Sequence, residues 1–244
     1  MGNARWTGVS LKAVRDAAGV AQVAVDGLDG PVVPETPDFV EALTIDHARS
    51  GEVMLAWGMN GQDLPFLNGF PVRLLVPGFS GAYWAKHLGA ITVLDQPFEG
   101  SWMKSAYRIP DTPCACSAPG KAPAAGVPIA RPNVRSFVTN LSDGAKIEAG
   151  PTALRGIAFE GGSGIERVAL STDDGRTWMP AELGQDLGRY AFRTWTATAE
   201  LGAGLHAIRV RATAKDGASR PMEPRWNPPG YLRNVVETTR VRAA

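Results

Sequence analysis

Arg73, Lys86 and Tyr107, in the stretch 69–107, are of the types that bind and process an anion. Arg73 interrupts an apolar run, 72–76, that has the length of a buried strand and lies between two prolines. A guanidinium in such a run needs an anion or a dense set of hydrogen-bond acceptors, and its planar shape suits phosphate. Lys86 and Tyr107 follow after a Pro-Gly turn. The stretch therefore indicates a local site for an anionic ligand or cofactor.

Each of these side chains also has an ordinary structural explanation. Arg73 and Lys86 could face one groove, or they could be a core arginine paired with a carboxylate and a surface lysine. Tyr107 follows Trp102 and fits a core aromatic as well as a catalytic tyrosine. Asp29 follows a predicted strand and is either a turn residue or an acceptor for a heterocyclic ligand. The three histidines lie far apart in the sequence, so they predict neither a metal cluster nor a Ser-His-Asp arrangement.

The composition argues against several classes of partner. The chain has 244 residues, 44% of them hydrophobic, which is enough for two domains. Lys and Arg total 25 against 24 Asp and Glu, so the net charge of +1 gives no general attraction to nucleic acid or to a membrane surface. Apolar runs are too short for a membrane span, and the first residues lack the pattern of a secretory signal. Any anion site must therefore be local.

The two cysteines, Cys114 and Cys116, are separated by one residue in a stretch rich in proline and alanine. This spacing predicts no disulfide between them, and two ligands alone do not make a zinc site. We expect a local structural role for both.

A change in composition divides the chain. The proline-rich stretch 111–132 predicts an extended connector, giving a first domain over 1–112, a linker over 113–132 and a second domain over 133–244. In the first domain we expect a short helix that starts at Ser10 and stops at Gly19, and strands over 23–25, 53–57, 72–76 and 91–94. Asn60-Gly61 predicts a tight turn. This domain is predicted to be mixed α/β.

The second domain shows a different pattern. Segments that alternate between apolar and polar residues begin near 135, 153, 165, 190, 206 and 235, and turn sequences such as 173–175 and 215–217 separate them. Short alternating strands of this kind predict an all-β immunoglobulin-like sandwich, so that the whole chain is α+β. The glycine-rich segment 161–164 lacks the residues of a phosphate-binding loop and is predicted to be a hairpin turn.

Taken together, these residues resemble the sulfite oxidase family of molybdopterin enzymes. Segments 2–11, 59–61, 69–73 and 76–78, with Lys86, are similar to its pterin-binding domain. Segments 173–178 and 226–227 are similar to its C-terminal dimerisation domain. Within the family, segments 51–60 and 233–238 most resemble the sulfane dehydrogenase catalytic subunits of bacterial thiosulfate-oxidising systems, followed by the sulfite dehydrogenases.

The resemblance implies a molybdenum-molybdopterin cofactor and assigns roles by matching position. It implies that the pterin is held by Asp29, Asn68, Arg73, Trp84, Ala85 and Lys86. Asn68 stands where many relatives have a histidine. Tyr107 matches the family's active-site tyrosine, and Arg233 is the candidate replacement for a substrate-pocket arginine whose place Pro229 takes.

The resemblance also implies an activity. The expected reaction is oxidation of sulfite or sulfane sulfur by oxygen-atom transfer, and the choice between these substrates stays open. Expected partners are a second copy of the chain through the C-terminal domain, a c-type cytochrome that accepts electrons and a sulfur-carrier protein, with no nucleic acid and no membrane span. The expected location is the periplasm.

One expectation concerns the metal. The family's molybdenum-ligating cysteine lies upstream of the segment 2–6, so the resemblance implies a fragment without that ligand, inactive as it stands. Neither cysteine of the chain is a credible substitute. The alternative is a non-catalytic dimerisation or sulfur-carrier-binding module with the same fold.

Overall fold

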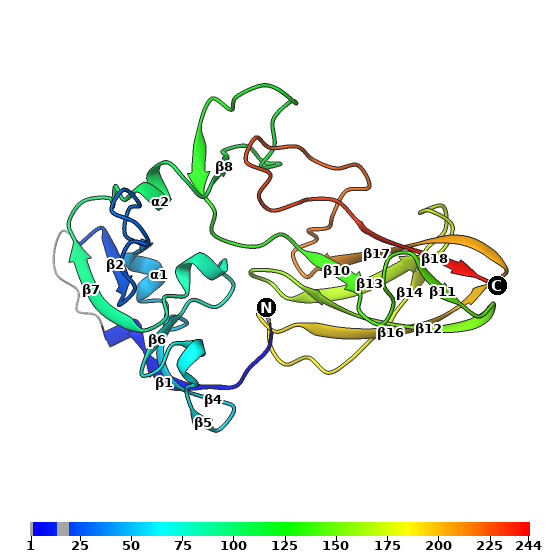
Figure 1. Ribbon diagram of the computed structural model, residues 1–244, viewed down its shortest axis with the longest axis horizontal. Helices are drawn as coiled ribbons and strands as arrows, with labels where there is room; N and C mark the ends of the chain where they lie inside the picture. Colours follow the sequence, from blue (N-terminus) through cyan, green and yellow to red (C-terminus); the bar gives the residue numbers. More distant parts are fainter. Residues whose placement is uncertain (1, 14–19) are drawn as a thin grey trace. The chain divides into compact units, whose positions relative to one another are not determined.

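The computed structural model describes residues 2–13 and 20–244, which form two compact units (Figure 1). The first unit comprises Met1–Ala115 and Pro123–Ala130, and the second comprises Cys116–Ala122 and Arg131–Ala244. The division between them falls inside the predicted linker. Each unit has its own hydrophobic core, so each is described separately.

The first unit contains three small sheets. The largest has β4 (Met54–Met59) at its centre, with β1 (Trp6–Ser10) on one side, β6 (Arg73–Leu75) on the other, and the short β5 (Gln62–Asp63). The second places β2 (Gln22–Gly27) between β3 (Val40–Thr44) and β7 (Leu88–Leu94). The third pairs β8 (Arg108–Pro110) with β9 (Gly126–Pro128). The strands predicted over 23–25, 53–57, 72–76 and 91–94 are confirmed.

Helices are few and short among the described residues of this unit. The α-helices are α1 (Ile45–Ala48) and α2 (Ser101–Lys104), and the 3-10 turns are η1 (Leu11–Ala13), η2 (Phe66–Asn68) and η3 (Gly81–Tyr83). The described part of the unit therefore has much less helix than a mixed α/β prediction suggested, and strands are its main regular elements. No helix in the described part of the chain has the length and apolar character needed to cross a membrane.

The predicted first helix is only partly described. Ser10 caps η1, since its hydroxyl accepts a hydrogen bond from the Lys12 N–H at 3.1 Å. The rest of the expected helix, over 14–19, lies outside the described residues. The predicted turn at Asn60-Gly61 is confirmed, because both residues have positive φ, 55° and 81°, and they join β4 to β5.

The proline-rich stretch is not the plain extended connector that its composition predicted. β9 returns to pair with β8, and Ile129 donates its N–H to the Tyr107 carbonyl at 2.7 Å. Prolines fit such an edge pairing because each strand needs N–H donors along one side only. Part of the predicted linker therefore belongs to the first unit.

The prediction for the two cysteines is wrong. Cys114 and Cys116 are disulfide-bonded, and as the only cysteines of the chain they bond to each other. Ala115 between them has a positive φ of 48°, which turns the backbone so that the flanking side chains face one another. Sequence spacing alone cannot show such a local turn.

The second unit is a sandwich of two sheets, as predicted. One sheet has the order β10 (Arg135–Val138), β12 (Gly150–Phe159), β16 (Arg193–Leu201), β15 (Glu182–Leu183). The other has the order β11 (Ala145–Ile147), β18 (Glu237–Ala243), β17 (Gly204–Ala214), β13 (Ile165–Ser171), β14 (Met179–Pro180). β11 pairs with β18 in parallel.

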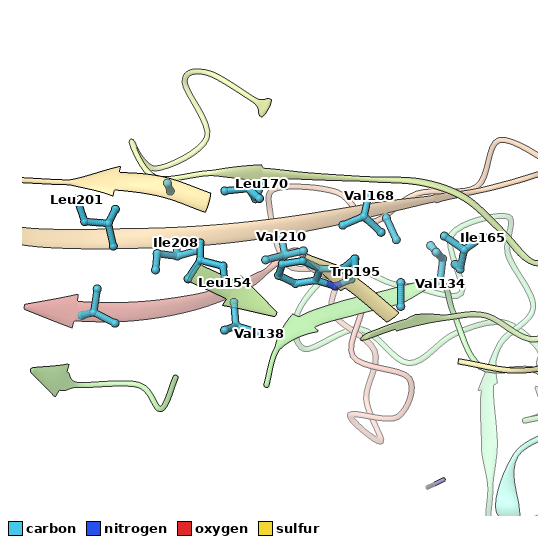
Figure 2. Packing of buried hydrophobic residues seen from close by; sticks show 14 of the residues in the cluster. Val134, Val138, Leu154, Ile165, Val168, Leu170, Trp195, Leu201, Ile208 and Val210 are labelled. Atoms are coloured by element: carbon cyan, nitrogen blue, oxygen red, sulfur yellow. The ribbon is translucent and has the colours of Figure 1, made fainter. Parts of the chain in front are cut away.

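Alternate residues of both sheets point inward and form the core of this unit. Figure 2 shows Trp195 of β16 among aliphatic side chains that come from both sheets. Trp195 is 1% exposed and Leu154, Leu170 and Ile208 are fully buried. Burying side chains of this size contributes about 1.5–3 kcal/mol each to stability.

The glycine-rich segment 161–164 does not form the predicted hairpin turn. It connects β12, which belongs to one sheet, to β13, which belongs to the other. Hairpin pairing is impossible there, because β12 already lies between β10 and β16, and β13 already lies between β17 and β14. The Glu160 carboxylate accepts hydrogen bonds from the N–H groups of Gly162 and Gly164 and holds the corner.

A first prediction tests the packing around Trp195. A side chain at Gly156 would lie 2.2 Å from the Phe137 carbonyl oxygen and 2.2 Å from Trp195 Cζ2, so Gly156→Ala should lower the free energy of unfolding by about 1–3 kcal/mol. Gly202→Ala is the control, since nothing lies within 4 Å of the added carbon. Urea unfolding followed by tryptophan fluorescence compares the two, and equal stability of both variants would contradict the packing.

Candidate functional site

The sheet around β4 brings Trp6 to Arg73. Gly8 of β1 lies opposite Ala56 of β4, and Ala56 lies opposite Arg73 of β6, so the three residues form one row across the sheet. A side chain at Gly8 would meet the Leu55 carbonyl oxygen at 2.1 Å, so only glycine allows this close approach. Trp6, two residues before Gly8, reaches the guanidinium, with 5.4 Å between the Arg73 Cζ and the ring centroid.

Arg73 is a buried cation held by neutral groups. It is 7% exposed, and its Nη1 and Nη2 donate to the carbonyls of Asn68, at 2.9 Å, and Trp84, at 3.2 Å. The Trp84 ring centroid lies 5.7 Å from Cζ. Burial lowers the pKa of Arg73 from its ordinary value, although a guanidinium stays protonated. Within the described residues no carboxylate lies within 4.0 Å of it, and its Nε has no partner.

Lys86 lies beside Arg73 across a glycine. The segment 84–88 runs along 69–74, since Leu74 donates to the Ala85 carbonyl and Leu88 to the Val72 carbonyl, both at 2.8 Å. Gly69 has a φ of 108°, and a Cβ there would lie 3.0 Å from the Lys86 Cβ and 3.1 Å from the Arg73 Cβ. The glycine thus keeps the two cationic side chains close together.

The Lys86 ammonium uses a neutral acceptor as well. Its Nζ donates to the Leu67 carbonyl at 2.7 Å, next to the Asn68 carbonyl that Arg73 uses. The turn η2 therefore offers its carbonyl oxygens to both cations and supplies no negative charge.

Asp29 lies close to the main chain of Lys86. A Cβ at Gly27 would lie 2.4 Å from Asp29 Oδ1 and 2.9 Å from the Lys86 carbonyl oxygen, so both atoms border the same glycine. Leu28 also donates its N–H to the His87 carbonyl at 2.8 Å. The structure thus brings together Asp29, Asn68, Arg73, Trp84, Ala85 and Lys86, which we call the cradle.

The cradle fits an anionic heterocyclic group. It holds two cations, Arg73 and Lys86, and among the described residues no carboxylate pairs with Arg73. The buried Nε of Arg73 and Nε1 of Trp84 have no hydrogen-bond partner among these residues. Donors and positive charge of this kind suit phosphate oxygens, and the Asp29 carboxylate suits ring N–H groups. A group of three or more His, Cys, Asp or Glu side chains able to hold a metal does not occur in the part of the chain that the structure describes.

Tyr107 belongs to a separate aromatic group of the same unit. Its ring centroid lies 5.7 Å from that of Trp102 and 6.1 Å from that of Phe39. The Trp102 indole donates to the carbonyls of Pro37, at 3.1 Å, and Asp38, at 2.9 Å. The position of Tyr107 at a metal and substrate stays a prediction.

Arg233 belongs to the second unit. Burial is the main cause that lowers the pKa of Arg220, and the positive charges of Arg135 and Arg233 lower it further. Arg220 donates to the carbonyls of Val134, at 2.7 Å, and Val235, at 3.0 Å, and to Glu237 at 3.0 Å. A role of Arg233 in a substrate pocket stays a prediction.

Sequence reasoning missed two contributors to the cradle, Trp6 and Leu67. In the sequence, Trp6 stands out only as part of the segment 2–11 that resembles the family. Its partner Arg73 is 67 residues away. Leu67 contributes a main-chain carbonyl, which any residue type supplies. The only available signal for Trp6 was its position two residues before Gly8, which is tightly packed in its strand.

A buried carboxyl, that of Glu41, interacts with Tyr83 next to the cradle. Glu41 of β3 is 6% exposed, and burial raises its pKa to about 7. Burial together with the charge of Glu41 raises the pKa of Tyr83 to about 12. Tyr83 directly precedes Trp84, so Glu41 is linked to the cradle through η3.

Two models of known domain families match this chain. The family model "Oxidoreductase molybdopterin binding domain" matches residues 1–102, and "Mo-co oxidoreductase dimerisation domain" matches residues 127–243. The mitochondrial sulfite oxidase of Macaca fascicularis is 32% identical over 99% of this chain and 47% of its own length. The human protein is 32% identical, over 95% and 45%. The chain thus spans about half the length of these curated relatives.

A solved structure shares the fold of both units. The sulfane dehydrogenase SoxCD from Paracoccus pantotrophus matches with a TM-score of 0.82, covering 97% of this chain and 59% of that chain at 22% sequence identity. Sulfite oxidase of Arabidopsis thaliana is 27% identical over 98% of this chain and 66% of its own length.

A second prediction concerns Glu41. Its folded pKa of about 7 lies above the ordinary 4.5, so the unfolded chain binds fewer protons between these values and the free energy of unfolding falls as pH rises through them. Glu41→Gln should therefore raise stability at pH 8 by about 1–3 kcal/mol and leave it unchanged near pH 4. Urea unfolding at both pH values measures this. The exposed Glu35→Gln is the control, and a gain at pH 4 equal to that at pH 8 would contradict the assignment.

A third prediction concerns Gly69. Gly69→Ala and Gly61→Ala both place alanine at positive φ, which costs about 1 kcal/mol, but only the first forces Lys86 and Arg73 apart. Gly69→Ala should therefore lose about 1–2 kcal/mol more in the free energy of unfolding than Gly61→Ala. Denaturant unfolding of the two variants measures this difference, and the opposite order would show that the cradle is loosely packed.

Proposed function

Because the chain belongs to the sulfite oxidase family of molybdopterin oxidoreductases, we propose that it acts in the oxidation of sulfite or sulfane sulfur by oxygen-atom transfer. The names of its relatives support both substrates: sulfite oxidase for the curated proteins and sulfane dehydrogenase for the solved structure. Both substrates are sulfur anions or sulfur groups that favour a positive environment.

The single observation that supports this function best is the desolvated charge of Arg73. A buried guanidinium whose contacts among the described residues are two carbonyls and two indole faces is costly unless an anion completes its surroundings. In this proposal, a phosphate group of the pterin is the anion that completes the surroundings of Arg73. Arg73 and Lys86 are the phosphate ligands in this proposal, and Asp29 accepts from the pterin ring.

The remaining cradle residues position the group. The main chain of Asn68, Trp84 and Ala85 borders the two cations and restricts where a ring can lie. When bound, the molybdenum cofactor supplies the oxygen-atom transfer chemistry and accepts the two electrons from sulfur. The protein contributes position and positive potential. Tyr107 is proposed to border the substrate oxyanion, and the role of Arg233 as a substrate-pocket residue is a separate proposal that follows from the resemblance alone.

The proposed setting is a homodimer in an oxidising compartment. The dimerisation domain over 127–243 supports a homodimer. The Cys114–Cys116 disulfide fits the periplasm, where disulfides persist. A c-type cytochrome as electron acceptor and a sulfur-carrier protein complete the proposal, and both follow from the resemblance to sulfane dehydrogenases.

A fourth prediction tests cofactor binding. The protein is produced in cells that make molybdopterin, and the bound pterin is measured by fluorescence after oxidation, with molybdenum measured by mass spectrometry. Arg73→Gln and Lys86→Gln should each reduce the pterin content at least about tenfold, because hydrogen bonds to charged groups are among the strongest. Lys104→Gln is the control, since Lys104 pairs with Glu99 away from the cradle.

The outcomes separate enzyme from module. Pterin in the unaltered protein, lost in the cradle variants and kept in the control, supports the proposed function. Absence of pterin from the unaltered protein favours the non-catalytic module of the same fold. Circular dichroism of Lys86→Gln shows whether any loss comes from unfolding, since Lys86 is far more exposed than Arg73.

A further inference from the structure

The outer face of the five-stranded sheet in the second unit is strongly basic. On β17 the buried residues Ile208, Val210 and Ala212 point into the core, so Arg209 and Arg211 point to the opposite face. The cross-strand register extends this face to the neighbouring strands. Its cations are Lys146, Arg167, Arg209, Arg211, Arg240 and Arg242. The whole chain carries a net charge of only +1, so this is a local concentration.

Some cations of this face pair with a carboxylate of the described part of the chain, and others do not. Arg209 pairs with Asp174 at 2.6 Å, and Arg240 lies 4.0 Å from Asp143. Among the described residues, no ion pair within 4.0 Å is found for Arg167 or Arg211. These two are the side chains that line a common pocket.

The pocket has a volume of about 280 Å³ and lies on β13 and β17. Arg167 lies opposite Thr213, and Ala169 lies opposite Arg211, so the two arginines are diagonal neighbours across the strand pair. Like charges this close on a sheet are destabilising. The short side chain of Ala169 leaves room between them. The pocket is lined by Arg167, Ala169, Arg211, Thr213, Gly217 and Ser219.

Arg211 is held in place before any ligand arrives. Its Cζ lies 4.2 Å from the ring centroid of Trp178. The Trp178 indole is itself fixed, because its Nε1 donates to the Gly175 carbonyl at 3.1 Å. A stacked guanidinium loses little further freedom when an anion binds, and it keeps its N–H groups available.

We propose that this pocket is an oxyanion-binding site for a sulfate or phosphate group. Arg167 and Arg211 supply the charge from two sides, and Thr213 and Ser219 line the same space, with the Ser219 hydroxyl donating to the Ala212 carbonyl at 3.0 Å. A second copy of the chain is a poor occupant of this face, since a two-fold contact brings arginines against arginines. The site does not depend on the cradle, because every residue that lines it belongs to the second unit.

The test is a titration of the whole chain with sodium sulfate and sodium phosphate, followed by calorimetry at constant ionic strength set with chloride. We expect saturable binding that Arg167→Gln and Arg211→Gln each weaken at least about tenfold. Arg242→Gln removes the same charge from the same face outside the pocket and should change the affinity less than about twofold. Arg73→Gln should leave the binding intact, which separates this site from the cradle.

Several outcomes would overturn the proposal. Loss of binding in Arg242→Gln equal to that in Arg211→Gln would show a general charge effect, and loss in Arg73→Gln alone would assign the anion to the cradle. Phenyl phosphate identifies the source of the group. Binding at least about tenfold tighter than inorganic phosphate points to a phosphate ester, and equal or weaker binding points to the free ion.

Discussion

The first unit is organised around one full positive charge that has been removed from water. Arg73 lies in the middle of a buried strand, and desolvation of a guanidinium is costly. Two carbonyls and two indole faces reduce that cost without cancelling the charge. The small residues around it follow from this requirement, because Gly8 lets the strands approach and Gly69 lets Lys86 come close. The same small residues therefore determine both the packing of the apolar interior and the geometry of the proposed anion site.

The second unit uses positive charge in a different way. Its core is aliphatic around Trp195, and its cations stand on a solvent-facing sheet surface. There the arginines are partly neutralised by aspartates and one is stacked on an indole. A surface cation remains solvated, so it binds anions weakly and reversibly, whereas the buried cation of the first unit favours one anion held for long periods. At the two proposed sites, the same residue type thus suits two kinds of anion binding.

The sequence predicted what depends on local pattern. The apolar run around Arg73, the Asn60-Gly61 turn and the alternating strands of the sandwich all follow from spacing and residue type. Errors arose where distant pairing or one backbone angle decides the outcome. Trp6 joins the cradle only through β4, and the corner at 161–164 depends on which sheet each strand enters. The disulfide depends on the positive φ of Ala115.

The place of β18 in its sheet has a consequence for synthesis on the ribosome. β18 is the last described strand to be translated, yet it lies between β11 and β17, and β11 makes its sheet pairing only with β18. Until it emerges, the long strand β17 presents an open edge with unpaired N–H and C=O groups. Every nascent chain on a messenger RNA passes through this stage with the edge of β17 open. The sandwich is therefore most exposed to mispairing in the interval between translation of β17 and release of β18.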